Sequence, residues 1–170
     1  MKRIARFEKV SRSQFEKDFL DTFGKEREAE CRAAYEQVSI PKRATLGSAG
    51  YDFVTPVPIE LAPGAMMKVP TGIRASMEEG WVLQIYPRSG LGFKYRLQLN
   101  NTVGIVDSDY YHSDNEGHIF VKITNDSREG KTLVLEAGSG FAQGIFMEFG
   151  ITEDDDAEAV RNGGFGSTGA

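Results

Sequence analysis

Short apolar or alternating runs dominate the chain after residue 45, and glycine, proline, asparagine and aspartate separate them. Runs of this length bounded by turn-forming residues predict β-strands, because alternate residues of a half-buried strand face the core. Their number and spacing favour an all-β sandwich or jelly roll. The expected strands cover residues 51–55, 66–69, 73–77, 81–86, 119–124, 132–135 and 141–149.

Residues 11–38 carry the only convincing helical periodicity. A capping-box pattern, Ser13-Gln14-Phe15-Glu16, predicts the start of a first helix, and Gly24 stands where that helix is expected to stop. A second, weaker helix is predicted over about residues 26–37 and ends before Ile40-Pro41. One face of the first helix carries Phe15, Phe19, Leu20 and Phe23, and one face of the second carries Ala29, Ala33 and Tyr35.

The composition fits one globular domain, with 170 residues, 40% hydrophobic and 26% charged. No apolar run approaches the ~20 residues of a membrane span, so no membrane contact is expected. The first six residues lack the apolar stretch of a signal peptide, which predicts a cytoplasmic location. Cys31 is the only cysteine; it fits a reducing compartment and is expected to serve in packing.

The net charge of −5 is unevenly distributed. Residues 1–45 contain 11 basic and 8 acidic side chains, whereas residues 46–170 contain 9 and 17. Because the main body lacks a basic stripe, direct nucleic-acid binding is not expected. The acidic run 153–156 is interpreted as a solvated linker rather than a metal site, since four consecutive carboxylates do not converge on one ion without an unusual loop.

Arg88, Ser89 and Gly90 follow an apolar strand, with Lys94 shortly after them. A cation, a hydroxyl and free backbone N–H groups at one strand end suit phosphate oxygens, which accept bonds from all three. The spacing is not that of a Walker A loop, which opens a helix with a different glycine pattern. The alternative interpretation is a solvated turn.

The segment 101–110 ends an apolar stretch with two carboxylates, Asp107 and Asp109. Strand alternation would place both on the same side of the chain. One of them is then a candidate for orienting and deprotonating a water nucleophile. The alternative is a polar turn that closes a strand.

Single polar residues in apolar surroundings mark further candidates. Asp52 stands near the start of an apolar strand, where aspartate is disfavoured, so it is expected to have a specific partner or a bond to a neighbouring turn. Gln143 is a lone amide in an apolar run and needs a backbone or ligand partner if buried. His112 and His118 show no metal-ligand spacing and are interpreted as loop residues.

The segment 163–169 contains four glycines together with Phe165, Ser167 and Thr168. Such a segment cannot build a core, because glycine has no side chain to bury and loses the most backbone entropy on ordering. Its N–H and hydroxyl donors beside one aromatic face suit a nucleotide, which combines phosphate with a ring. The alternative is a disordered tail.

Taken in order, five of these segments resemble the five motifs of the homotrimeric dUTPase family. The resemblance covers about residues 38–170 and rests on order, spacing and residue type. It is carried by Ala49-Gly50-Tyr51-Asp52-Phe53, Pro87-Arg88-Ser89-Gly90 with Lys94, Asn101 through Tyr110, Ala142-Gln143, and Gly163 through Gly169.

This resemblance implies a distorted β jelly roll of the dUTPase-like β-clip type, assembled as a trimer with three active sites between subunits. The expected organisation is an N-terminal helical extension over residues 1–38, a β domain over 39–150, and a linker with a flexible glycine-rich arm over 151–170. The implied reaction is Mg²⁺-assisted attack of water on the α-phosphorus of dUTP, giving dUMP and pyrophosphate. It limits uracil in DNA and supplies dUMP for dTMP synthesis.

The same resemblance implies the role of each site residue. Asp107 activates the water, Tyr110 packs under the deoxyribose, and Asn101 with the backbone near Gly104 reads the uracil. Asp52 assists Mg²⁺ indirectly through water, while the triphosphate holds most of the ion. The phosphates are held by Arg88, Ser89, Gly90 and Gln143, and a neighbour's arm contributes Arg161, Phe165, Gly166, Ser167 and Thr168.

Three departures from the family pattern stand out. The loop 111–117 is longer than the usual turn, the segment 138–143 lacks the usual acid and base, and Arg161 lies one residue closer to Phe165. A dCTP deaminase of the related class is one alternative. A nucleotide-sensing module with a partner on the Phe15, Phe19 and Phe23 face is another, against a helix that simply caps the β body.

Overall fold

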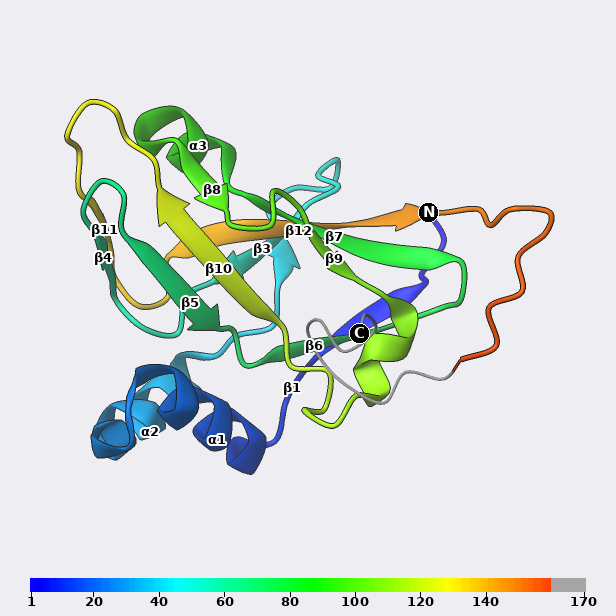
Figure 1. Cartoon of the computed structure of the whole chain (residues 1–170), viewed down its shortest axis with the longest axis horizontal. Helices are drawn as coiled ribbons and strands as arrows, with labels where there is room; N and C mark the ends of the chain where they lie inside the picture. Colours follow the sequence, from blue (N-terminus) through cyan, green and yellow to red (C-terminus); the bar gives the residue numbers. More distant parts are fainter. Residues whose placement is uncertain (160–170) are drawn as a thin grey trace.

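The computed structural model describes residues 1–159, and within them twelve strands form four small antiparallel sheets. Figure 1 shows the sheets stacked around a common interior, with helices at the periphery. The largest sheet has the strand order β2-β3-β12-β7-β9, and the second has the order β5-β10-β8. The strands are β1 Ala5–Lys9, β2 Lys42–Arg43, β3 Tyr51–Val54, β4 Ile59–Leu61, β5 Met66–Pro70, β6 Ile73–Met77, β7 Trp81–Pro87, β8 Leu97–Leu99, β9 Gly104–Val106, β10 Phe120–Asn125, β11 Leu133–Leu135 and β12 Gly140–Glu148.

The long strand β12 organises the largest sheet, because it pairs with β3 on one side and β7 on the other. Gln143 on β12 lies opposite Asp52 on β3 and opposite Tyr86 on β7. Three segments that are far apart in the sequence therefore meet along one strand. The prediction of a mainly β, jelly-roll-like fold is confirmed.

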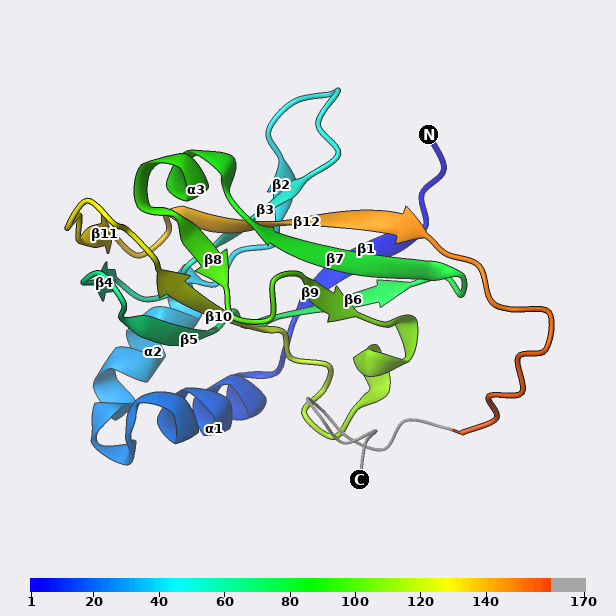
Figure 2. The same ribbon diagram turned by 45° about the horizontal axis from the view of Figure 1, so that its top comes forward.

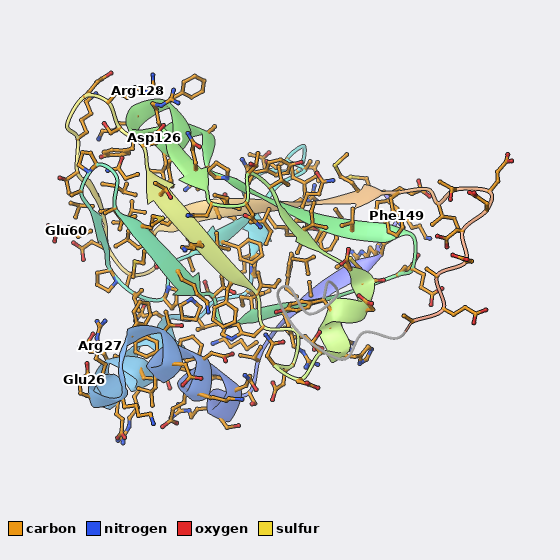
Figure 3. The ribbon with its side chains drawn as sticks, in the orientation of Figure 1. Glu26, Arg27, Glu60, Asp126, Arg128 and Phe149 are labelled. Atoms are coloured by element: carbon orange, nitrogen blue, oxygen red, sulfur yellow. The ribbon has the colours of Figure 1, made fainter. Side chains whose placement is uncertain are left out.

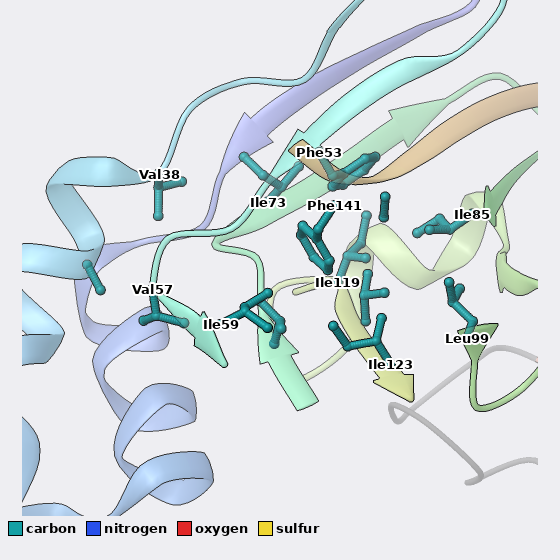
Figure 4. Close-up of a cluster of buried hydrophobic side chains, with 14 of the residues drawn as sticks. Val38, Phe53, Val57, Ile59, Ile73, Ile85, Leu99, Ile119, Ile123 and Phe141 are labelled. Carbon is teal, nitrogen blue, oxygen red and sulfur yellow. The ribbon is translucent and has the colours of Figure 1, made fainter. Parts of the chain in front are cut away.

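The core fills the space between the sheets (Figure 4). Phe53 and Phe141 are 1% and 0% exposed and belong to one core cluster with Val121 and Ile123 of the second sheet. Strand β10 buries every second residue, as expected for a strand with one face on the core. Full burial of an apolar side chain such as Val121 or Ile123 contributes about 1.5–3 kcal/mol. Fully buried members include Ile59, Ile73, Leu83, Ile85, Ile119, Ile123 and Leu133.

The predicted helical region contains two α-helices, α1 (Arg12–Phe23) and α2 (Glu28–Gln37), joined by a 3-10 turn, η1 (Lys25–Arg27). The predicted start at Ser13 was wrong, because Ser11 is the N-cap and its hydroxyl accepts the Gln14 N–H at 3.1 Å. The cap is therefore shifted by two residues, and it is not a capping box, because the Gln14 amide donates to Asp18 and the Ser11 N–H donates to Glu116. Gly24 ends α1 as predicted, with φ of 111°.

Helix α1 lies against the β body beside β5, as Figures 1 and 2 both show. Phe15 and Phe19 are 0% exposed, so the helix face that carries them is covered by the chain itself and is not a free docking surface. The predicted face of α2 was wrong, since Cys31 and Ala34 are the buried positions. Cys31 packs in the core as predicted.

The outer end of the helix pair is polar, with Glu26 and Arg27 pointing away from the sheets (Figure 3). None of the helices within residues 1–159 is long and apolar enough to span a membrane.

The N-terminal segment also holds a strand that the sequence did not predict. Strand β1 pairs antiparallel with β6 from Ala5↔Met77 to Lys9↔Ile73. The charged residues within Ala5–Lys9 disguise its alternation. The first residues are therefore part of the β body, and only α1, η1 and α2 project from it.

Gly72 is a position where only glycine fits. Its φ is +73°, and an added Cβ would lie 2.5 Å from Cγ2 of Val38. We predict that Gly72→Ala lowers the free energy of unfolding by about 2–4 kcal/mol, because left-handed strain and overpacking combine. The matched control is Gly80→Ala, with φ of +80° and no neighbour within 4 Å, which should lose only about 1 kcal/mol. Urea unfolding of both variants measures this difference, and equal losses would contradict it.

Candidate functional site

Asp52, Arg88 and Gln143 form a polar cluster where β3, β12 and β7 meet; we call it the Arg88 cluster. Nε of Arg88 lies 3.4 Å from Oδ1 of Asp52, and both side chains are partly exposed. The Gln143 amide donates to the carbonyl of Pro87 at 3.3 Å. Gly50 leaves room for this amide, since a Cβ there would lie 2.6 Å from Oε1 of Gln143. Asp52 thus has the specific partner expected for it, and Gln143 has a backbone partner.

Ser89 and Gly90 begin a short helix, α3 (Ser89–Tyr95), so the interpretation of this motif as a turn was wrong. Arg88 precedes the helix with extended backbone, and its carbonyl accepts the N–H groups of Leu91 and Gly92. The first N–H groups of any helix lack intrahelical acceptors. Here those groups belong to Ser89 and Gly90, which directly follow Arg88 in the chain.

Asp107 follows β9 and precedes a 3-10 helix, η2 (Ser108–His112). The strand ends at Val106, so Asp107 and Asp109 do not alternate along a strand and that expectation was wrong. The Asp107 carbonyl accepts the Tyr110 N–H at 3.2 Å, which ties the two motif residues together. Tyr110 is 5% exposed, and its hydroxyl donates to the carbonyl of His118 at 2.8 Å.

A pocket of about 360 Å³ lies beside this segment, and its lining includes Asn101, Gly104 and Val106. We call it the hairpin pocket, because β9 and the turn before it form one wall. Gly104 allows close packing of that wall, since an added Cβ would lie 3.1 Å from Cβ of Ile85. Asp107 is the residue that follows this wall.

The Arg88 cluster and Asp107 lie at opposite ends of β7. On β7, Leu83 is opposite Val106 of β9, whereas Pro87 is opposite Ala142 of β12. An extended segment of six residues spans ~20 Å. Figure 1 shows α3 at one end of β7 and the light-green η2 near the other. The structure therefore brings Asp52, Arg88 and Gln143 together, and keeps them apart from Asp107.

His118 lies in the loop before β10, as expected, but it is 0% exposed, which the sequence did not predict. Its Nδ1 lies 2.6 Å from Oδ2 of Asp18, and its Nε2 accepts the Gly72 N–H at 2.8 Å. Burial raises the pKa of the Asp18 carboxyl, but hydrogen bonds from His118 and Gln14 outweigh burial and hold that pKa below its usual range. The alternating residues that follow His118 were the signal that this histidine begins a buried segment.

The arm residues Arg161, Phe165, Gly166, Ser167 and Thr168 lie outside the described residues. The acidic run 153–156 is exposed, which agrees with a solvated linker. Within residues 1–159, no three His, Cys, Asp or Glu side chains are grouped to hold a metal ion. Mg²⁺ commonly binds through one or two carboxylates plus substrate phosphates and keeps several waters. Asp52 offers one carboxylate of this kind, and its Oδ1 already lies 3.4 Å from Nε of Arg88.

The fold places the chain among the jelly-roll proteins, and comparison with known sequences narrows the class. A protein-family model described as dUTPase matches residues 36–169. The deoxyuridine 5′-triphosphate nucleotidohydrolase of Lactococcus lactis subsp. lactis (strain IL1403) is 44% identical over 136 residues, which cover 78% of this chain and 89% of the relative. The chain belongs to the dUTPase family.

Solved structures agree with this membership. A dUTPase from Streptococcus mutans has a TM-score of 0.63 and 37% identity, covering 87% of this chain and 98% of its own. A dUTPase from phage phi11 of S. aureus, described with a structural Mg(II) ion, has a TM-score of 0.57 and 21% identity over 75% of this chain and 95% of its own, and shows the fold alone. The chain is therefore an enzyme of the dUTPase family.

Gly140 controls the position of the Arg88 side chain. An added Cβ at residue 140 would lie 2.5 Å from Nη1 of Arg88, which is the end of a flexible side chain. We predict that Gly140→Ala displaces the guanidinium, changes the free energy of unfolding by less than about 1 kcal/mol and raises KM for dUTP about three- to tenfold. Steady-state kinetics and urea unfolding measure both effects. Gly47→Ala, where no atom lies within 4 Å, is the control and should leave KM unchanged.

Proposed function

We propose that the chain hydrolyses dUTP to dUMP and pyrophosphate by in-line attack of water on the α-phosphorus, with Asp107 as the base. The observation that supports this most is the place of Asp107, which follows the wall of a nucleobase-sized pocket. A carboxylate there accepts the proton of a water as its oxygen attacks phosphorus. Catalysis then rests on positioning and on neutralising charge that develops on the phosphate oxygens.

The hairpin pocket is the proposed nucleoside site. Asn101 and the backbone at Gly104 read the uracil edge, and Tyr110 lies under the deoxyribose, where a 2′-hydroxyl would collide with it. Close packing of the hairpin leaves no room for a 5-methyl group, which excludes dTTP. Cytosine presents the wrong donors and leaves polar groups of the pocket unpaired, which is a costly mismatch.

The Arg88 cluster is the proposed phosphate site. The Arg88 guanidinium and the first N–H groups of α3, at Ser89 and Gly90, suit phosphate oxygens, and the Gln143 amide adds a donor. Mg²⁺, when bound, would supply positive charge that offsets the charge of the triphosphate, and Asp52 would assist it indirectly through water. Asp52 holds Arg88 in place and accepts hydrogen bonds from waters near the triphosphate.

Each site is proposed to be shared between the subunits of a homotrimer. The phosphate site and Asp107 of one chain lie ~20 Å apart along β7, which is too far for one nucleotide to place its α-phosphate at both. A second chain must therefore supply its Arg88 cluster to the hairpin of the first. The glycine-rich arm of the third chain, with Arg161, Phe165, Gly166, Ser167 and Thr168, covers the uracil and the terminal phosphates.

The proposed product, dUMP, feeds dTMP synthesis, and removal of dUTP limits uracil in DNA. We place this work in the cytoplasm, where the free thiol of Cys31 is stable.

A substrate panel tests the proposed function. Pyrophosphate release is measured with dUTP, dTTP, dCTP and UTP, each with Mg²⁺ and with excess EDTA. The proposal expects turnover of dUTP at least about 100-fold above the others and a strong loss without Mg²⁺. Comparable hydrolysis of all four nucleotides would reject the proposal, and ammonia release from dCTP would identify a deaminase.

Asp107→Asn tests the role of the carboxylate. An amide cannot accept the proton from water, so kcat should fall at least about 1,000-fold, while the Kd of a non-hydrolysable dUTP analogue changes by less than about threefold. Asp114→Asn, which neutralises an exposed carboxylate in the neighbouring loop, is the matched control and should keep wild-type kcat. Retention of kcat in Asp107→Asn would remove Asp107 from the mechanism.

A further inference from the structure

Helix α1 lies before the segment that matches the dUTPase family, yet it is bonded to the loop that follows Tyr110. That loop, residues 111–117, is longer than the usual family turn. Two carboxylates join them: Asp18 of α1 contacts His118, and Glu116 of the loop contacts Ser11. Such contacts between distant segments order a loop that water would otherwise solvate.

Glu116 attaches the loop to the first turn of α1. Its two carboxylate oxygens accept the Ser11 N–H at 2.8 Å and the Ser11 hydroxyl at 2.7 Å. The bond from the Ser11 backbone, followed by the one from its hydroxyl, lowers the pKa of Glu116. The loop turns sharply to reach this point, because Glu116 and Gly117 have φ of +58° and +71°. A Cβ at Gly117 would lie 2.7 Å from Cα of Tyr111, so only glycine fits.

Both nitrogen atoms of the His118 ring have hydrogen-bond partners. The Gly72 N–H can only donate, so Nε2 is the acceptor and the ring hydrogen on Nδ1 faces the Asp18 carboxylate. The Asp18 side chain is 12% exposed, so its bond to His118 is largely shielded from water. The backbone N–H of His118 donates to Asn115 at 3.1 Å, and the main chain at residue 118 is thereby fixed.

The same backbone fixes Tyr110. The Tyr110 hydroxyl donates to the His118 carbonyl at 2.8 Å and accepts from the Asn115 amide at 2.9 Å. Both capacities of the hydroxyl are therefore used within the loop. A shift of residue 118 moves an acceptor on which the orientation of the tyrosine ring depends.

We propose that Asp18 and His118 are positioning residues for substrate selection: Asp18 fixes the His118 ring, and the His118 carbonyl fixes Tyr110 against the deoxyribose. Helix α1 thereby tunes discrimination between dUTP and UTP without touching the nucleotide. The inference rests on the proposed role of Tyr110. A purely structural role for the pair would lower stability but leave the ratio of kcat/KM for dUTP and UTP unchanged.

The test compares Asp18→Ala and Asp18→Asn with Arg12→Ala in the full chain. Arg12 pairs with Glu36 of α2 and has no contact with the loop among the described residues, so its variant weakens the helix pair alone. Asp18→Ala should lower the dUTP/UTP ratio of kcat/KM about five- to tenfold, the effect of one positioning hydrogen bond. Asp18→Asn keeps an acceptor for Nδ1–H and should lose only about two- to threefold.

Amide hydrogen exchange over residues 108–118 provides a readout that needs no catalysis. Faster exchange there in Asp18→Ala, and wild-type exchange in Arg12→Ala, supports the coupling even if the wild type fails to hydrolyse dUTP. That failure would reject the proposed function alone. If the wild type is active and the Asp18 variants match Arg12→Ala in both the ratio and the exchange, the coupling is wrong. Should Asp18→Ala not fold, Asp18→Asn decides the question by the same two measurements.

Discussion

Strand β7 is the constraint on which the candidate site depends. It is paired along its length with β12 and, over its middle residues from Leu83 to Ile85, with β9, so its two ends are held at a fixed distance. The cation Arg88 leaves one end, and the carboxylate Asp107 adjoins the other. An extended strand cannot shorten, because its backbone is already committed to hydrogen bonds on both sides. Under the proposed function, one chain therefore offers two half-sites, which a site shared between chains would bring together.

Polar contacts, as well as apolar packing, hold helix α1 of the N-terminal segment against the β body. Phe15 and Phe19 are buried between α1 and the β body, and the contact of Asp18 with His118 fixes the position of the helix on that body. Buried polar pairs of this kind are costly when half satisfied, and here every member has a partner. The result is a helix that stabilises the fold and also reaches a loop next to the candidate nucleoside site.

Alternation and turn residues predicted the main strands of the β body and its class, and the phenylalanine spacing predicted α1. Strand β1 was missed because its charged residues hide the alternation of buried and exposed positions. The 3-10 helix η2 was missed because strand alternation was expected to continue past Val106, where β9 ends. The motifs identified Asp52, Arg88 and Gln143 individually, but only pairing through β12 brings them together. The burial of His118 was not predicted, since its partner Asp18 is 100 residues away in the sequence.

Subunit mixing tests the shared site most directly. Asp107→Asn and Arg88→Ala chains, each nearly inactive alone, are unfolded together in equal amounts and refolded as mixed assemblies. If one chain supplies the carboxylate and another the cation, random assortment places both intact residues together at about one site in four. The account predicts recovery of about a quarter of wild-type activity by this assortment. No recovery in mixed assemblies of proven composition would contradict it.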